Sequence, residues 1–110
     1  MQILCAFDDL AENSAKGFEL AWQGQQLQVL IARRDGRVYA YRNLCPHRGT
    51  TLDWLPDQFM DPDRQYLQCA THGALFRLED GTCIAGPCVG KQLSPLAAEV
   101  REGMVVLLGN

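Results

Sequence analysis

The chain contains two histidines, and each of them lies close to a cysteine. His47 follows Cys45 in the stretch CPHRG, and His72 follows Cys69 in the stretch CATHG. A glycine comes shortly after each histidine, where it lets the backbone turn sharply. Thiolates and imidazoles are ligands that iron–sulfur clusters and zinc use in proteins. The two Cys–His pairs therefore indicate a metal centre built from two loops.

The spacing of these residues helps to distinguish an iron–sulfur cluster from a structural zinc ion. Zinc sites with two cysteines and two histidines usually pair like with like, as Cys-x(2–4)-Cys and His-x(3–5)-His. Here each cysteine is paired with a histidine, and 21 residues, 48–68, separate the two pairs. The mixed pairs are unusual for structural zinc, although a zinc site and an iron–sulfur cluster both stay open on the residues alone.

Five cysteines are many for a chain of 110 residues. The odd count, in a chain without a recognisable signal peptide, favours metal ligation over a disulfide framework. Cys5 fits a plain core position. Cys83 and Cys88 flank the stretch IAGP and have two interpretations: a redox pair or disulfide near the metal, or two small side chains packed in a tight loop. A reducing compartment favours packing.

Short runs rich in Val, Ile, Leu and Tyr alternate with turn signals, as in antiparallel sheets. The connectors WQGQQ, RDGR, EDGT and REGM each carry a glycine where a tight hairpin needs a positive φ. Residues 28–32 lack a clean alternation, which predicts burial on both faces. Residues 7–16 have room for one helical turn, and 53–64, with two prolines and four aspartates, is expected to be a loop. The predicted strands span residues 2–6, 17–22, 26–34, 37–43, 65–69, 75–79, 82–84, 96–101 and 104–109.

These elements predict one all-β domain, residues 1–110, made of small antiparallel sheets. A hydrophobic content of 47% is enough for a folded core. The net charge of −3, from 10 basic and 13 acidic residues, argues against nucleic acid as a partner. No apolar run is long enough to span a membrane, and MQILCAFDDL lacks the features of a signal peptide. We therefore expect a cytoplasmic protein.

The motifs resemble those of the Rieske iron–sulfur proteins, whose pattern is Cys-x-His, then about 15 to 20 residues, then Cys-x-x-His. DGRVYAYRNLCPHRG resembles the strand that enters the first cluster loop, and VREGMVVLL resembles the last two strands. LQCATHGALFRLEDGTCIAGP resembles the second loop, a hairpin and the proline loop that covers the cluster. The resemblance spans about residues 26–108, and the extra length between the motifs is assigned to the 53–64 loop. It implies a Rieske-type fold with two cluster-binding loops.

The resemblance also implies one [2Fe-2S] cluster and its ligands. Cys45 and Cys69 would bind the inner iron, and His47 and His72 the outer iron. With two thiolates and neutral histidines the oxidised cluster carries no net charge, whereas four thiolates would leave two negative charges. Rieske potentials are accordingly higher, roughly −150 to +300 mV against about −400 mV for plant-type ferredoxins.

Four positions predict a potential near the low end of that range. Thr50 and Thr71 stand where high-potential members carry the two cysteines of a disulfide. Ala74 and Phe76 stand where those members carry a serine and a tyrosine that donate hydrogen bonds to cluster sulfurs. Each missing donor leaves the added negative charge less stabilised.

The implied function is one-electron transfer in the manner of the ferredoxin components of ring-hydroxylating oxygenase systems. A flavin reductase would supply the electron and an oxygenase would receive it, by transient docking near His47 and His72. The chain is not expected to be an enzyme itself, since both histidines are committed to the cluster and none is left for a mononuclear oxygenase iron site. Gly86 and Pro87 would cover the cluster and exclude water.

Two other classes stay open at this stage. The chain fits a small Rieske subunit of a larger reductase such as an assimilatory nitrite reductase, some of which lose the ligands that are present here. It also fits a metal-binding or redox-sensing module without an electron-transfer partner. Arg48 and the aspartates of the 53–64 loop have two interpretations each, a contact with a redox partner or simple solvation.

Overall fold

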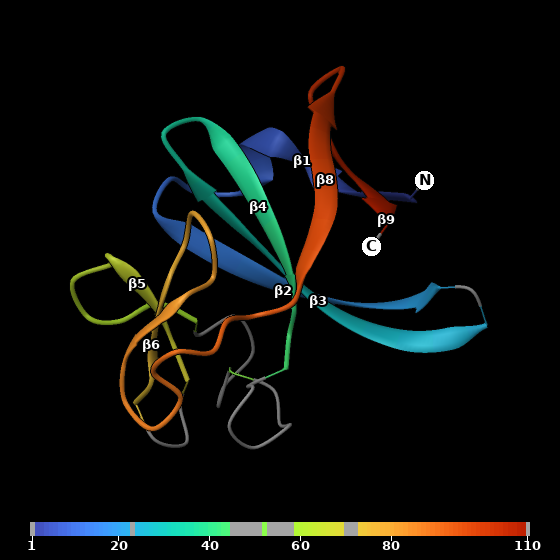
Figure 1. Cartoon of the computed structure of the whole chain (residues 1–110). Coiled ribbons are helices and arrows are strands. Elements are labelled where there is room, and N and C mark those ends of the chain that lie inside the picture. The colour runs from blue at the N-terminus through green and yellow to red at the C-terminus, as the bar shows by residue number, and fades with distance from the viewer. Residues whose placement is uncertain (1, 23, 45–51, 53–58, 70–72, 110) are drawn as a thin grey trace.

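The computed structural model describes residues 2–22, 24–44, 52, 59–69 and 73–109. In these ranges the chain forms two antiparallel sheets, and this confirms the all-β fold class (Figure 1). The first sheet has six strands in the order β1-β9-β8-β4-β3-β2, and the second has three in the order β5-β6-β7. The elements are β1 (Gln2–Ala6), the 3-10 helix η1 (Phe7–Asp9), β2 (Ser14–Trp22), β3 (Gln25–Arg34), β4 (Arg37–Arg42), β5 (Tyr66–Gln68), β6 (Leu75–Arg77), β7 (Cys83–Ala85), β8 (Pro95–Arg101) and β9 (Met104–Gly109).

Tight glycine turns set the register of the large sheet. Arg34 pairs with Arg37 across a two-residue turn in which Asp35 and Gly36 have φ of 54° and 73°. Two positive φ values in succession are the mark of a type I′ turn, whose twist matches that of the flanking strands. The turn between β8 and β9 repeats this pattern at residues 102 and 103, with φ of 50° and 75°. The hairpins predicted from the RDGR and REGM stretches are therefore confirmed.

The middle of β3 is buried on both faces, as the lack of alternation in residues 28–32 predicts, although Gln28 itself is exposed. Its residues from Val29 to Ala32 are all 0% exposed. Leu30 and Ala32 belong to one hydrophobic cluster, whereas Val29 and Ile31 belong to another. The large sheet therefore separates two cores. The inter-sheet core contains residues of both sheets. The outer core contains residues of the large sheet and Leu10, and Phe7 of η1 packs against it.

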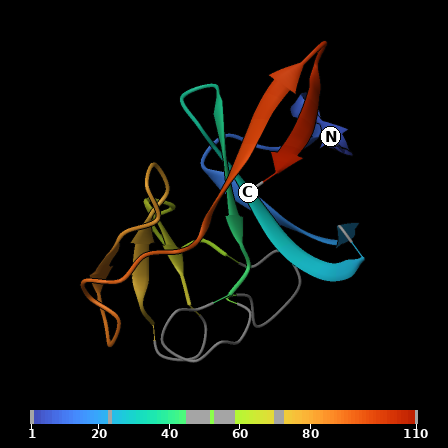
Figure 2. The same cartoon turned by 45° about the vertical axis from the view of Figure 1, so that its right-hand side comes forward.

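Pairing between distant parts of the chain completes the large sheet, and further long-range contacts attach the small sheet to it. The strand β1 pairs with β9, with Gln2 opposite Leu107, so the two ends of the chain lie side by side (Figures 1 and 2). The small sheet packs against one face of the large sheet, where Leu30 of β3 and Tyr41 of β4 share a core with Phe76 of β6. The hydroxyl of Tyr41 on β4 donates a 2.6 Å hydrogen bond to the carbonyl of Leu78, which follows β6. Arg34 adds a second link, since its guanidinium donates to the carboxylate of Glu79 and to the carbonyl of Arg64.

The observed boundaries differ from the predicted ones mainly at β2. This strand begins at Ser14, three residues before the predicted start, because its pairing with β3 continues to Ser14 opposite Arg33. Residues 7–9 form the short helical turn that the sequence allows. Within the described ranges this is the helical structure of the chain, and no helix there is long and apolar enough to cross a membrane.

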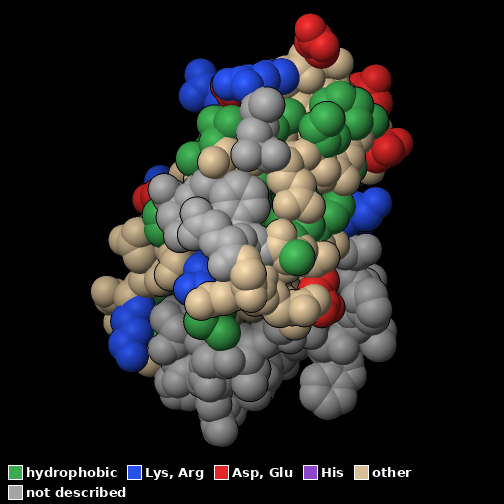
Figure 3. Space-filling view, turned by 90° about the vertical axis from the view of Figure 1, so that its right-hand side faces the viewer, with side chains coloured by type: hydrophobic (Ala, Val, Ile, Leu, Met, Phe, Trp, Pro, Cys, Tyr) green, Lys and Arg blue, Asp and Glu red, His purple; other side chains and the backbone are tan. Residues whose placement is uncertain are grey.

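Charged side chains of both signs share the described surface. On the face drawn in Figure 3, Lys and Arg side chains and Asp and Glu side chains lie among hydrophobic ones, without a continuous patch of one sign. This distribution agrees with the small net charge of −3. It gives that face none of the one-sided positive charge typical of nucleic-acid binding.

Candidate metal centre

Cys69 is the predicted ligand that lies within the described residues, and it stands where β5 ends. Its side chain is buried, with 1% of the residue exposed. The N–H of Cys69 donates to the carbonyl of Ala74 over 2.8 Å, and the N–H of Gly73 donates back to the carbonyl of Cys69 over 2.9 Å. Gly73 has a φ of +70°, a value that suits a residue without Cβ. Two hydrogen bonds thus close the base of the second predicted ligand loop and hold Cys69 in a fixed place.

Asn43 closes the base of the first predicted ligand loop. Its backbone N–H donates to the carbonyl of Gln28 on β3, and its side-chain Oδ1 accepts a 2.8 Å hydrogen bond from the N–H of Leu52. Asn43 is only 5% exposed, and it is the one polar side chain counted as buried among the described residues. A buried amide oxygen of this kind compensates a backbone N–H that has no partner in a sheet. The chain before the first Cys–His pair is thereby tied to the chain that follows it.

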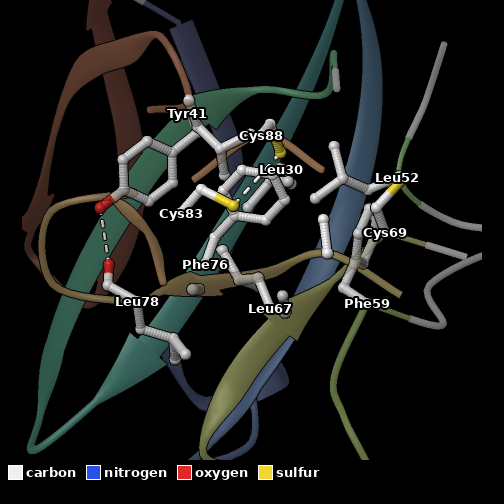
Figure 4. Close-up of a cluster of buried hydrophobic side chains, with 14 residues drawn as sticks. Leu30, Tyr41, Leu52, Phe59, Leu67, Cys69, Phe76, Leu78, Cys83 and Cys88 are labelled. Atoms are coloured by element: carbon white, nitrogen blue, oxygen red, sulfur yellow. Dashed lines mark hydrogen bonds between the residues drawn. The ribbon is translucent and has the colours of Figure 1, made fainter. Parts of the chain in front are cut away.

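The bases of the two loops adjoin. Leu52 of the first loop and Cys69 of the second belong to the inter-sheet core, together with Phe59 and Phe76. In Figure 4 the side chains of Leu52 and Cys69 lie next to each other at one edge of this core. Cys45, His47 and His72 lie outside the described residues. The structure therefore brings the end of the first predicted ligand loop next to the start of the second, and it shows the position of one of the four predicted ligands.

The predicted covering loop packs against the second ligand loop. Gly86 has a φ of +96°, and a Cβ built on it would lie 2.7 Å from the Cα of Ala74. The loop is closed on itself, because the N–H of Cys83 donates to the carbonyl of Lys91 and the N–H of Lys91 donates to the carbonyl of Cys88. Only a glycine permits so close an approach between the two backbones.

The surroundings of Cys69 are apolar. The inter-sheet core holds aliphatic and aromatic side chains and three cysteines, and no charged side chain belongs to its described members. Ala74 and Phe76, whose side chains have no hydroxyl group, are both buried in this core, with exposed fractions of 1% and 0%. Burial in these surroundings raises the pKa of Tyr41 above its ordinary value. A phenolate, like any added negative charge, finds little solvation in such an environment.

Several other residues discussed in the sequence analysis pack in a core or stabilise a turn. Cys83 and Cys88 are buried in the inter-sheet core, as the packing interpretation predicts. Cys5 is half-buried against the outer core, and burial raises the pKa of its thiol. Asp61 accepts hydrogen bonds from the N–H groups of Gln65 and Tyr66, so it stabilises a turn. Arg48, Thr50, Thr71 and the aspartates at 53 and 57 lie outside the described residues.

Two of the residues that shape the site carry weak signals in the sequence. Asn43 is an isolated polar residue between a strand and the first motif, and only the structure reveals that its amide accepts a hydrogen bond from a residue nine positions later. In the sequence Tyr41 is indistinguishable from other aromatic strand residues, although its hydroxyl links the two sheets. Pairing over long stretches of chain is not encoded in a local pattern.

The described part of the centre fits a cluster held between two loops. A buried thiol stands at the edge of an apolar core, glycines allow close approach of the backbone, and both loop bases are closed by hydrogen bonds. A family model described as the Rieske [2Fe-2S] domain matches residues 1–102. The chain belongs to the Rieske [2Fe-2S] domain family. This membership confirms the resemblance seen in the motifs and indicates a [2Fe-2S] cluster as the cofactor, in preference to zinc.

Relatives of this Rieske chain include a ferredoxin that matches almost all of it. The chain is 31% identical over 106 residues to the ferredoxin component of the alkene monooxygenase system of Xanthobacter autotrophicus, covering 96% of this chain and 78% of that protein. It is also 31% identical over 75 residues to the terminal oxygenase component of carbazole 1,9a-dioxygenase of a Sphingomonas species, covering 68% of this chain and 19% of that protein. Since the first of these relatives is a ferredoxin, an electron carrier, it supports the prediction of an electron-transfer protein that is not itself an enzyme.

A solved structure shares the fold. The ferredoxin of carbazole 1,9a-dioxygenase from Nocardioides aromaticivorans IC177 superposes with a TM-score of 0.76 and covers 100% of this chain and 97% of its own. Its sequence identity to this chain is 22%, so this similarity shows the fold alone. It confirms the Rieske-type arrangement of small antiparallel sheets.

Proposed function

We propose that this Rieske chain, residues 1–110, is a single-domain one-electron carrier. It takes an electron from a flavin-dependent reductase and passes it to an oxygenase-type terminal component. The observation that carries this proposal is that the bases of the two predicted ligand loops meet on one apolar core. A relative that matches 96% of this chain is the ferredoxin component of a monooxygenase system, and this similarity supports the proposal.

The cluster would be held by Cys45 and Cys69 through thiolates and by His47 and His72 through imidazoles. Cys69 supports this assignment, because its buried thiol lies beside Leu52, at the closing point of the loop that carries the other pair. When bound, the group supplies one reversible electron. The residues of this chain would orient it, exclude water from it and set the stability of its reduced form.

The reduced form would be weakly stabilised, and the potential would lie near the low end of the Rieske range. Ala74 and Phe76 offer no hydroxyl hydrogen to the cluster, and the core beside them holds no charged side chain among its described members. An added electron is therefore balanced by few local dipoles. A redox titration of the purified protein followed by its visible absorbance tests this, and a midpoint well above 0 mV would contradict it.

The ligand assignment is tested by the iron and acid-labile sulfide content of anaerobically purified protein. We expect two irons and two sulfides per chain, and a red-brown colour that partly bleaches with dithionite. Cys69→Ala should lose both, whereas the matched variant Cys5→Ala should keep them, because Cys5 packs against the outer core away from the centre. Zinc without sulfide in the wild type, or a full cluster in Cys69→Ala, would refute the assignment.

The carrier role is tested with a flavin reductase, NADH and a terminal oxygenase of a monooxygenase or dioxygenase system. The chain should be reduced by the reductase and should support repeated oxygenase turnover at substoichiometric amounts. Docking between a carrier and its partner is transient and steered by charge, so the rate should fall as the ionic strength rises. A stable stoichiometric complex with one large reductase would favour the subunit alternative.

A further inference from the structure

Cys83 and Cys88 form a pair of thiols in contact. The Sγ atom of Cys88 donates a hydrogen bond to the Sγ atom of Cys83, with a sulfur–sulfur distance of 3.2 Å. Cys83 in turn donates to the carbonyl of Ala85, also over 3.2 Å. In Figure 4 the two side chains point toward each other beside the ring of Phe76. No disulfide joins the two side chains in the structure.

The backbone around this pair is already arranged as a closed loop. Lys91 bonds to both ends of it, because its carbonyl accepts from Cys83 and its N–H donates to the carbonyl of Cys88. A disulfide needs a sulfur–sulfur distance of about 2.05 Å, so the two Sγ atoms need to approach by only roughly 1.1 Å. Rotation of the two side chains and a small shift of a surface loop can supply such a movement.

The pair lies beneath an exposed turn. Cys83 and Cys88 are 2% and 1% exposed, whereas Val89, the next residue, is 61% exposed. A Cβ placed on Gly90 would meet nothing within 4 Å, so this turn stands in open space. Turns with few packed neighbours open locally at low free-energy cost, and such an opening exposes the thiols to small molecules.

We propose that Cys83 and Cys88 are a reversible dithiol–disulfide site. In the forward direction one thiolate attacks a small-molecule disulfide of the glutathione type, forming a mixed disulfide and releasing one glutathione thiol. The second thiolate attacks the mixed disulfide, forms the Cys83–Cys88 bond and releases the second thiol. Two protein thiols are oxidised, one small disulfide is reduced to two thiols, and excess glutathione reverses both steps.

The disulfide would change the loop that covers the candidate metal centre. Gly86 and Pro87 lie between the two cysteines, and Gly86 is pressed against the backbone of Ala74 at the base of the second ligand loop. A covalent bond between positions 83 and 88 fixes the span of this loop. The site does not depend on the proposed electron transfer, since its chemistry uses only the two thiols.

The test uses the wild-type protein as purified, equilibrated in mixtures of reduced and oxidised glutathione, quenched by alkylation in denaturant and digested with trypsin. Cleavage after Arg77 and Lys91 releases the peptide 78–91, LEDGTCIAGPCVGK, which contains both cysteines and no other. We expect the doubly alkylated peptide to be replaced by an unalkylated peptide that is two hydrogens lighter than the free dithiol form. The singly alkylated glutathione adduct, which is the intermediate, should not accumulate. Dithiothreitol should restore both alkylation sites.

Two variants test whether Cys83 and Cys88 are the residues that form the bond. Cys83→Ser should give, at most, a mixed disulfide of Cys88 with glutathione, whereas the matched variant Cys5→Ser should form the 83–88 bond as the wild type does. A wild-type peptide 78–91 that stays doubly alkylated in oxidised glutathione would overturn the proposal. Accumulation of glutathione adducts without the internal bond would also overturn it, as would a disulfide that joins Cys5 to another position. Because the readout is alkylation, its result is independent of whether the cluster carries electrons.

Discussion

Gly86 combines two constraints at one residue. Its φ of +96° disfavours any residue with a Cβ, and that Cβ would stand 2.7 Å from the Cα of Ala74. We expect Gly86→Ala to lower the free energy of unfolding by roughly 1–2 kcal/mol for the backbone and by about 1–3 kcal/mol more for the overpacking. Urea unfolding followed by circular dichroism measures the sum.

Gly90 separates these two contributions. It has nearly the same φ, +95°, but a Cβ placed there meets no atom within 4 Å. Gly90→Ala should therefore cost only the backbone part, roughly 1–2 kcal/mol. Equal losses for the two variants would show that the contact of Gly86 with Ala74 does not restrict the loop.

Tyr41 links the two sheets through its hydroxyl, and its loss should be measurable. Tyr41→Phe leaves the buried carbonyl of Leu78 without this donor, and we expect a loss of about 1–3 kcal/mol. Tyr39→Phe is the matched control, because Tyr39 packs against the same core, and its hydroxyl has no hydrogen bond among the described residues. A similar loss in both variants would point to ring packing as the cause.

The raised pKa of Tyr41 predicts a pH dependence. Burial raises the pKa in the folded state, so the folded chain keeps this proton above about pH 10, where the unfolded chain releases it. The unfolded state then binds fewer protons, and the contribution of Tyr41 to stability, constant below about pH 10, falls as the pH rises further. Unfolding free energies measured from pH 8 to higher values should fall less steeply in Tyr41→Phe than in the wild type.

The sequence offers candidate ligands, but it does not show the contacts that support them. The positions of Cys69 and of the glycines follow from local motifs, because ligand spacing and turns are local properties. The hydrogen bond from Leu52 to Asn43 and the contact of Gly86 with Ala74 depend on how distant segments meet. No periodicity or motif encodes such meetings.

At the scale of elements, a hydrogen bond to Asn43 closes the first predicted ligand loop. Asn43→Ala leaves the buried N–H of Leu52 without its acceptor, and we expect a loss of about 1–3 kcal/mol. Because the loop ends are then no longer tied, the iron content per chain should also fall. Asn13→Ala removes an amide of the same kind at a turn in contact with Arg34, and it should leave the iron content unchanged.

Strands and hairpins are the elements that the sequence predicts best. A glycine with a positive φ stands in each of the four predicted turns, and the continuous burial of residues 29–32 in β3 follows from their unbroken apolar run. The pairing of β1 with β9 is not predicted, since it joins the two ends of the chain. Local propensity determines a strand, whereas the choice of its partner is decided by the whole fold.

For the whole molecule, the division into two cores predicts how removal of iron affects stability. The inter-sheet core includes Leu52, Cys69 and Ala74 at the bases of the ligand loops, whereas the outer core is assembled mainly from the large sheet. Metal ligation is coupled to folding, so its loss should act first on the core that the ligand loops share.

Hydrogen exchange on the protein before and after chelation of its iron measures this division. The amides of β5, β6 and β7 should lose protection after chelation, whereas those of β1, β8 and β9 should keep most of theirs, since their hydrogen bonds lie within the large sheet. An equal loss over both sheets would mean that the chain unfolds as one cooperative unit without its metal. Unchanged protection in β5–β7 would mean that hydrogen bonds and packing alone, without the metal, fix the place of the small sheet.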